Sequence, residues 1–194
     1  MVARPGEGPL LKLDGRRCAL RQWAKSDVPS LVRHANNLNV AKHLRDRFPH
    51  PYTRTHASAF LTHAAASDTP TNFAIAVGEE AVGGIGYVRG SDVERYSAEV
   101  GYWLGEEFWG RGIATEALQL LTQYLFAEEQ LLRLFALPLA DNAGSIRVLE
   151  KAGYEREGLL RASCVKYGER RDQLLYARVN ADWKGTVTDS EEPS

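Results

Sequence analysis

Long apolar runs are missing from this sequence, and no segment stays apolar over the length that a bilayer requires. The first residues, MVARPGEGPLLKL, also lack the apolar stretch of a secretion signal. Cysteine is scarce, because Cys18 and Cys164 are the only two and cannot make a disulfide framework. We therefore expect a cytoplasmic protein with two reduced thiols and no membrane partner.

An excess of basic charge is missing too, because 24 Lys and Arg residues are balanced by 25 Asp and Glu residues. A general nucleic-acid binder usually shows a basic excess, so we expect no nucleic-acid partner. The five histidines form neither an H-E-x-x-H motif nor a cluster with cysteine. We expect no metal site, and we expect the histidines to have structural or surface roles.

The remaining composition is typical of a globular protein, with 44% hydrophobic and 25% charged residues in 194. This length suits one compact domain with a substantial core. Residues 1–9 are rich in Gly and Pro, and residues 184–194 are polar, so we expect flexible ends. The single domain is expected to span residues 10–183.

Apolar spacing and turn residues divide the chain into strands and helices. Strands are predicted on both sides of Asp14-Gly15, at 73–77, 81–90, 98–104 and 134–140, and twice after Gly153. Helices are predicted after Ser26 or Asp27, at about 55–66, at 113–129, and from Asn142 to about Lys151. This order indicates an α/β (α+β mixed) domain with a mixed sheet.

The stretch EEFWGRGIATEA places two glycines between a predicted strand and the helix that begins at Ile113. A glycine loop there can point free backbone N–H groups outward, and the helix dipole adds partial positive charge. Such a loop suits phosphate or pyrophosphate, and a simple strand-to-helix turn is the alternative. It is not a Walker loop, because no G-x-x-x-x-G-K-[ST] run occurs. It is not a Rossmann loop, because Thr115 replaces the third small residue.

A second stretch, NAGSIRVLEKAGY, begins with Asn142 and Ser145 near the start of a helix. Both residue types cap helices well, so capping alone explains their presence. Together with AEVGYWL, EEFWGRGIATEA and YGERRDQLLYARV, however, this stretch resembles the GNAT superfamily of acetyl-CoA-dependent N-acetyltransferases. The resemblance covers about residues 10–180 and is nearest to the RimJ/RimL branch, whose members acetylate the N-terminal amines of ribosomal proteins.

The resemblance implies a GNAT-type fold, acetyl-CoA as cosubstrate and no metal. The expected sheet is central, mixed and mostly antiparallel, with about seven strands flanked by about four helices. A homodimer is also expected, because dimers are common among such proteins.

The family signature Q/R-x-x-G-x-G/A implies which residues bind the cosubstrate. It aligns with Trp109, Gly110, Arg111, Gly112, Ile113 and Ala114, and with Thr115 these residues are expected to bind the pyrophosphate. Trp109 departs from the usual Gln or Arg, and Arg111 either assists a phosphate or lies in solvent. The resemblance implies that the pantetheine arm contacts Tyr102, Trp103, Leu104 and Asn142, and that Ser145 and Arg147, one turn further along, also bind the cosubstrate.

Glu99 is the candidate general base. An acceptor amine must lose a proton before it attacks a thioester, since an α-amine has a pKa near ~8 and a lysine one near ~10.4. Strand alternation puts Glu99, Gly101 and Trp103 on one face, and Gly101 leaves space beside the carboxylate. The alternative for Glu99 is an exposed or ion-paired carboxylate.

The general acid is less clear from the sequence. Many GNAT enzymes have a tyrosine where this chain has Leu149, so Ser145 or water is expected to protonate the leaving thiolate. Neither cysteine occupies a motif position, which favours direct transfer in a ternary complex over an acyl-cysteine.

A protein N-terminal α-amine is the leading acceptor, with a polyamine, an aminoglycoside or an amino-acid-like amine as alternatives. A non-catalytic acyl-CoA sensor is the alternative of another class. The segment 34–56, with Arg45, Arg47, His50 and Tyr52, is expected to shape the acceptor cleft. Glu106 and Glu107 face either the acceptor or solvent.

Overall fold

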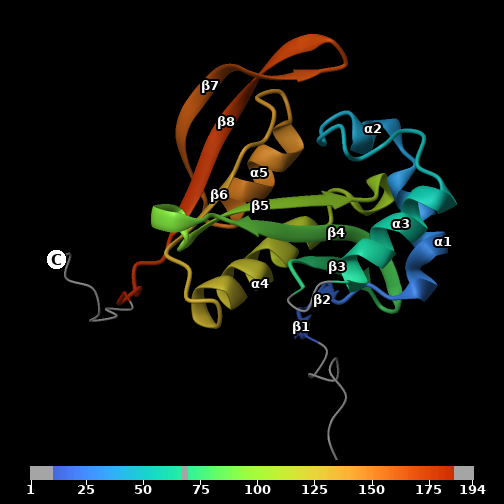
Figure 1. Ribbon diagram of the computed structural model, residues 1–194, viewed down its shortest axis with the longest axis horizontal. Helices are drawn as coiled ribbons and strands as arrows, with labels where there is room; N and C mark the ends of the chain where they lie inside the picture. Colours follow the sequence, from blue (N-terminus) through green and yellow to red (C-terminus); the bar gives the residue numbers. More distant parts are fainter. Residues whose placement is uncertain (1–10, 67–69, 186–194) are drawn as a thin grey trace, which may run out of the picture.

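A computed structural model describes residues 11–66 and 70–185 of the chain. Within these residues one eight-stranded sheet has the order β1-β2-β3-β4-β5-β6-β8-β7 (Figure 1). The strands are β1 (Lys12–Asp14), β2 (Ala19–Arg21), β3 (Asn72–Val77), β4 (Glu80–Arg89), β5 (Ser97–Leu104), β6 (Arg133–Ala136), β7 (Glu155–Lys166) and β8 (Glu169–Val179). Only β5 and β6 pair in parallel among these strands; the other neighbours are antiparallel.

The same residues form five α-helices and three short 3-10 turns. The helices are α1 (Val28–Ala35), α2 (Leu38–Ala41), α3 (Arg54–Ala65), α4 (Ile113–Ala127) and α5 (Ala143–Lys151). The turns are η1 (Lys25–Asp27), η2 (Asp92–Glu94) and η3 (Glu106–Phe108). The mixed, mostly antiparallel α/β fold is confirmed, with one strand and one helix more than the approximate numbers expected. None of these helices is long and apolar enough to cross a membrane.

Two predicted elements have different bounds in the structure. The helix expected after Asp27 ends at Ala35, because Asn36 leaves the helical region and the Asn37 side chain caps α2 by accepting from the Asn39 amide at 2.8 Å. The strand expected at 134–140 stops at Ala136, two residues before Pro138, which has no N–H to donate.

The flexible ends predicted at 1–9 and 184–194 lie outside the described residues, apart from 184 and 185.

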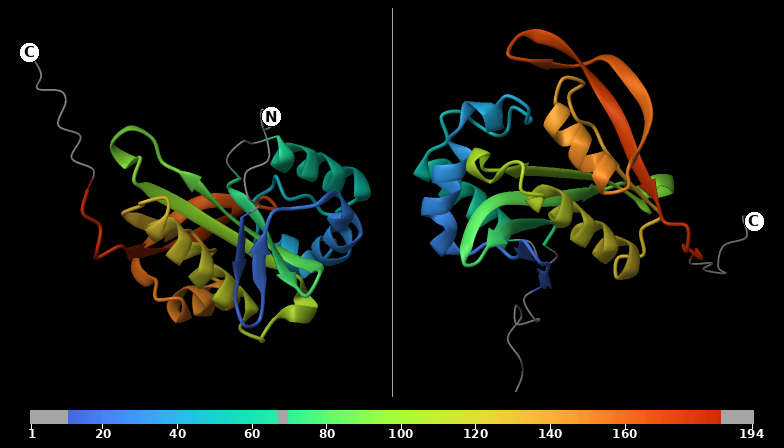
Figure 2. Two further views of the ribbon diagram at one scale, coloured as in Figure 1. Left: turned by 90° about the horizontal axis from the view of Figure 1, so that it is seen from below. Right: turned by 180° about the vertical axis from the view of Figure 1, so that it is seen from behind.

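Helices cover both faces of the sheet. The main core lies between the sheet and α4, whose buried positions recur at helical spacing as Ile113, Ala117, Leu118, Leu121 and Leu125. A second cluster packs α1 and α3 on the opposite face, around Leu31, Tyr52 and Leu61. The views in Figure 2 show α4 and α5 on one side of the sheet.

The sheet opens between β5 and β6, and this opening positions the candidate site. The two strands pair only over Ser97–Glu99 and Arg133–Phe135. Beyond Glu99, β5 continues to Leu104 with only β4 beside it among the described strands. The chain after β6 turns away into α5, so a gap forms between the end of β5 and the start of α5 (Figure 1).

Candidate active site

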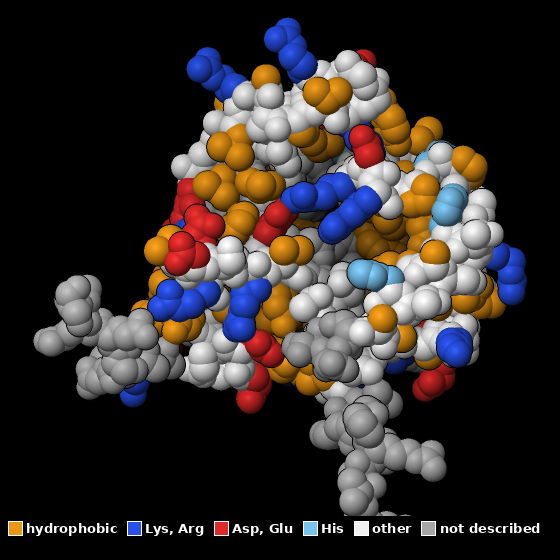
Figure 3. Space-filling view, viewed as in Figure 1, with side chains coloured by type: hydrophobic (Ala, Val, Ile, Leu, Met, Phe, Trp, Pro, Cys, Tyr) orange, Lys and Arg blue, Asp and Glu red, His pale blue; other side chains and the backbone are white. Residues whose placement is uncertain are grey.

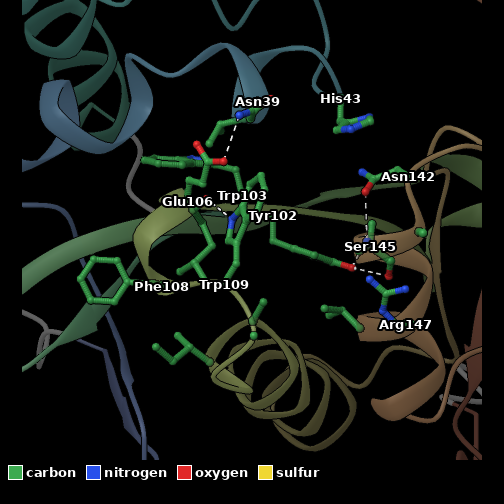
Figure 4. Close-up of a pocket in the computed structure, with 18 of the residues that line it drawn as sticks. Asn39, His43, Tyr102, Trp103, Glu106, Phe108, Trp109, Asn142, Ser145 and Arg147 are labelled. Atoms are coloured by element: carbon green, nitrogen blue, oxygen red, sulfur yellow. Dashed lines mark hydrogen bonds between the residues drawn. The ribbon is translucent and has the colours of Figure 1, made fainter.

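A cleft of about 610 Å³ lies where β5 and β6 diverge. Its walls are the end of β5, the loop into α4, the first turn of α4, one side of α5, and α2 with the loop after it (Figure 4). Twelve of the predicted cosubstrate residues line it: Tyr102, Trp103, Leu104, Trp109, Gly110, Gly112, Ile113, Ala114, Thr115, Asn142, Ser145 and Arg147. The structure thus brings together motifs that are up to 45 residues apart in the chain.

The glycine loop has the backbone of an anion site. Gly110 and Gly112 have φ values of 76° and 77°, and Gly112 is the N-cap of α4. This left-handed region favours glycine. The amides of residues 110–115 donate to no acceptor within 11–66 and 70–185, whereas the next amide bonds to the Gly112 carbonyl at 3.1 Å. Free amides at a helix N-terminus fit a pyrophosphate, so the donor set suits coenzyme A.

Trp109, which departs from the family signature, and Arg111, whose role the sequence left open, differ in their placement. The Trp109 indole Nε1 donates to the Leu104 carbonyl at 2.8 Å, so the ring closes the turn from β5 into the loop while lining the cleft. Arg111 is exposed and does not line the cleft. Its guanidinium lies 5.3 Å from the centre of the Phe108 ring.

The start of α5 is tied to β5 through hydroxyl groups. Asn142 caps α5 by accepting from the Ser145 amide at 3.1 Å. The Tyr102 hydroxyl lies 2.9 Å from Ser145 Oγ and donates to the Ser145 carbonyl at 3.2 Å (Figure 4). Burial raises the pKa of Tyr102 above its ordinary value, so this phenol stays protonated at neutral pH. Asn142 thus both caps α5 and lines the cleft.

Glu99 does not line the cleft, although strand alternation puts it on the same face of β5 as the cleft residue Trp103 and opposite Tyr102. Its carboxylate pairs with Arg45, a residue of the segment expected to shape the acceptor site. A Cβ at Gly101 would meet nothing within 4 Å, so the predicted space beside Glu99 is present. The same loop is tied to β7 by Asp46 and Lys166, whose charged atoms are 2.8 Å apart.

Figure 3 shows Lys and Arg side chains next to acidic ones in a hollow on this face, between the β7–β8 hairpin and the helices.

Several other residues considered from the sequence lie away from the cleft, either in the core or at the surface. Tyr52 is buried in the second core cluster, while Arg47 and His50 lie at or near the surface. Leu149, at the family's tyrosine position, is fully buried in the main core. Cys18 is also buried, and burial together with Glu116 raises its pKa to about 12, which makes it a poor nucleophile.

The helix α2 and its cleft residues were not predicted individually, although they lie in the segment 34–56 that was expected to shape the acceptor cleft. Asn39, Lys42 and His43 line the cleft where β5 and β6 diverge, and His43 was expected to have a structural or surface role only. His43 Nδ1 is buried and has no hydrogen-bond partner among the residues that the structure describes, and burial lowers the pKa of this ring. A helix of four residues has too little periodicity to be predicted, so the sequence offered no signal for α2 itself.

The two acidic residues that open the glycine stretch both bind the N-terminal helices. Glu106 lines the cleft and accepts from the Asn37 and Asn39 side chains at 2.6 and 2.9 Å. Glu107 lies 3.2 Å from both Arg33 and His34 Nδ1. These bonds fasten η3, and with it the loop into α4, to α1 and α2.

No group of three or more His, Cys, Asp or Glu side chains in the described part of the chain is arranged to hold a metal ion.

Comparisons with known proteins agree with this geometry. A sequence model described as an acetyltransferase (GNAT) domain matches residues 17–155. The chain is 28% identical to a Bacillus licheniformis protein named Uncharacterized N-acetyltransferase p20 over 175 residues, which are 87% of this chain and 96% of p20.

Two other relatives match over a shorter part. The chain is 41% identical over 86 residues to Probable N-acetyltransferase YjcK of Bacillus subtilis, and 29% identical over 102 residues to the [ribosomal protein uS5]-alanine N-acetyltransferase of Escherichia coli. These matches cover 44% and 51% of this chain, and 48% and 53% of those relatives, about half of each.

Among solved structures, the ribosomal L7/L12 acetyltransferase RimL in complex with coenzyme A has the same fold. Its TM-score is 0.77 at 21% identity, and the match covers 87% of this chain and 98% of RimL. Because the domain model covers more than half of the chain, the protein belongs to the GNAT acetyltransferase family and is an acetyl-CoA-dependent N-acetyltransferase.

Proposed function

We propose that the enzyme acetylates the N-terminal α-amine of a protein and binds acetyl-CoA in the cleft between β5 and α5. The observation that carries this placement is that, within residues 11–66 and 70–185, the amides of 110–115 have no acceptor and the adjacent edge of β5 has no strand partner beyond Glu99. The acceptor class is supported by the uS5-alanine N-acetyltransferase and by RimL, which act on ribosomal proteins.

In this proposal one set of residues binds the cosubstrate, and Glu99 accepts the proton of the acceptor amine. The amides of 110–115 hold the pyrophosphate, and the free edge of β5 from Val100 to Leu104 offers backbone groups to the amides of the pantetheine arm. Acetyl-CoA supplies the thioester. The hydroxyls of Tyr102 and Ser145 are hydrogen-bonded to each other, and the Ser145 hydroxyl can donate a hydrogen bond to the leaving thiolate, which takes its proton from water.

Glu99 acts as the general base. Arg45 holds its carboxylate in place, and an acceptor amine can approach it over Gly101. The amine transfers its proton to the carboxylate as the C–N bond forms and the C–S bond breaks. Direct transfer requires no cysteine, in agreement with the burial of Cys18.

The cytoplasm is the proposed location, because the proposed acceptors are ribosomal proteins. A homodimer stays a prediction, which sedimentation of the purified protein checks.

The test is an acceptor screen with mass detection of the product. It offers acetyl-CoA with peptides beginning in Ala or Ser, the same peptides with blocked N-termini, spermidine and an aminoglycoside. We expect one acetyl group on the free peptides only, and less product at neutral pH from Glu99→Gln. Acetylated spermidine or aminoglycoside without acetylated peptide would overturn the acceptor. Binding of coenzyme A without product from any amine would indicate the sensor.

A further inference from the structure

Two cations on α5 line the cleft. They are Arg147 and Lys151, which are one helical turn apart. No carboxylate among the described residues forms an ion pair with either side chain. Lys42, on the opposite wall, already donates to the Asn39 side chain at 3.0 Å. Two neighbouring cations without a counter-charge favour an anionic ligand.

The position of these two cations along α5 indicates which part of coenzyme A they contact. Asn142 and Ser145, at the start of α5, lie on the pantetheine side of the cleft. Lys151 is the last residue of α5, six residues after Ser145 and therefore about 9 Å further along the helix axis at 1.5 Å per residue. Its carbonyl accepts from Gln119 in α4 at 3.3 Å, so this end lies beyond the glycine loop that begins α4.

Coenzyme A carries phosphate at two places, the pyrophosphate and the 3′-phosphate of its ribose. The free amides of 110–115 suit the first of these, and they leave the second without a partner. A phosphate monoester carries close to two negative charges at neutral pH and prefers Arg and Lys as partners. A cation in the last turn also interacts with the helix dipole, which explains Lys151 alone but not Arg147 one turn earlier.

We propose that Arg147 and Lys151 form a subsite for the 3′-phosphate of coenzyme A. The enzyme then discriminates between coenzyme A and 3′-dephospho-coenzyme A by charge. This inference rests on the proposed placement of the cosubstrate in the cleft, and it adds Lys151 to the binding residues.

The experiment is calorimetric titration of the full chain with coenzyme A and with 3′-dephospho-coenzyme A. We expect the wild type to bind coenzyme A at least about tenfold more tightly, as charge-assisted bonds to a phosphate predict. Arg147→Gln and Lys151→Gln should each weaken coenzyme A binding and leave dephospho-coenzyme A binding nearly unchanged. The double variant should bind both ligands equally.

Lys25→Gln is the matched control, because Lys25 is exposed in η1 and does not line the cleft. It should keep the wild-type ratio, and thermal unfolding of each variant checks that the fold is intact. Equal binding of the two ligands by the wild type would overturn the subsite alone, as would variants that weaken both ligands to the same extent. No binding of either ligand would instead overturn the placement of coenzyme A in the cleft.

Discussion

Glu116→Gln is expected to lower the free energy of unfolding by about 2 kcal/mol, because this carboxylate holds the β1–β2 hairpin against α4. Its Oε2 accepts from the amides of Arg17 and Cys18 at 2.6 and 3.1 Å, and its Oε1 accepts from the Arg16 amide at 3.1 Å. The side chain is 15% exposed and lies in the first turn of α4, where a negative charge is favourable.

The magnitude follows from which bonds the substitution removes. A glutamine keeps one carbonyl oxygen for two of the amides but turns its NH2 group toward the third. Losing one charge-assisted bond costs ~1.5–3 kcal/mol, and losing the charge at the helix start costs ~0.3–1 kcal/mol. Because water can reach the exposed hairpin amides, the lower part of this range applies. For a chain of this size, about 2 kcal/mol corresponds to a fall in Tm of about 4–8 °C.

The pH dependence of this effect has a definite sign. Burial by itself raises the pKa of Glu116, but the three backbone bonds outweigh it and hold the pKa below its ordinary value of 4.5. A depressed carboxyl pKa contributes stability above the unfolded-state value and loses it as the pH falls through the folded-state value. The difference between wild type and Glu116→Gln should therefore be constant from pH 6 to 8 and shrink below about pH 4.5.

Urea unfolding at several pH values measures this difference. Glu128→Gln, at the other end of α4, removes the same charge and should change the stability by less than about 0.5 kcal/mol. A Glu116→Gln effect no larger than that of Glu128→Gln, or one that persists unchanged in acid, would refute the reasoning.

Three further substitutions test other parts of the structure. Gly112→Ala should destabilise the fold by about 1–2 kcal/mol, because φ is 77° there, and it should weaken coenzyme A binding in titration calorimetry. Gly101→Val should lower kcat/KM for the acceptor by about tenfold or more without changing coenzyme A affinity, because it fills the space beside Glu99. Leu121→Ala, at a fully buried position of α4, should cost about 2–5 kcal/mol in urea unfolding.

The elements with long, regular patterns were predictable from the sequence. The apolar stripe of α4 and the glycines before it predict the start of α4 and the candidate anion site there, because both signals are local. The helix α2 was missed, since two asparagines compete with the helical backbone and leave one short turn.

The contacts that complete the site depend on tertiary structure instead. The hydrogen bond between Tyr102 and Ser145, the ion pair of Glu99 with Arg45, and the bonds of Glu106 each join residues far apart in the chain. Sequence spacing does not predict such partners, because the splay of β5 from β6 decides which side chains meet.

Hydrogen exchange at the amides of 110–115, with and without coenzyme A, tests the central claim most directly. These amides have no acceptor among the described residues, so they should exchange quickly in the free protein and slow down when the pyrophosphate binds. Exchange at the amides of β3, which β4 and β5 separate from β6 in the sheet, should be unaffected. Binding of coenzyme A that leaves exchange at 110–115 unchanged would contradict the account.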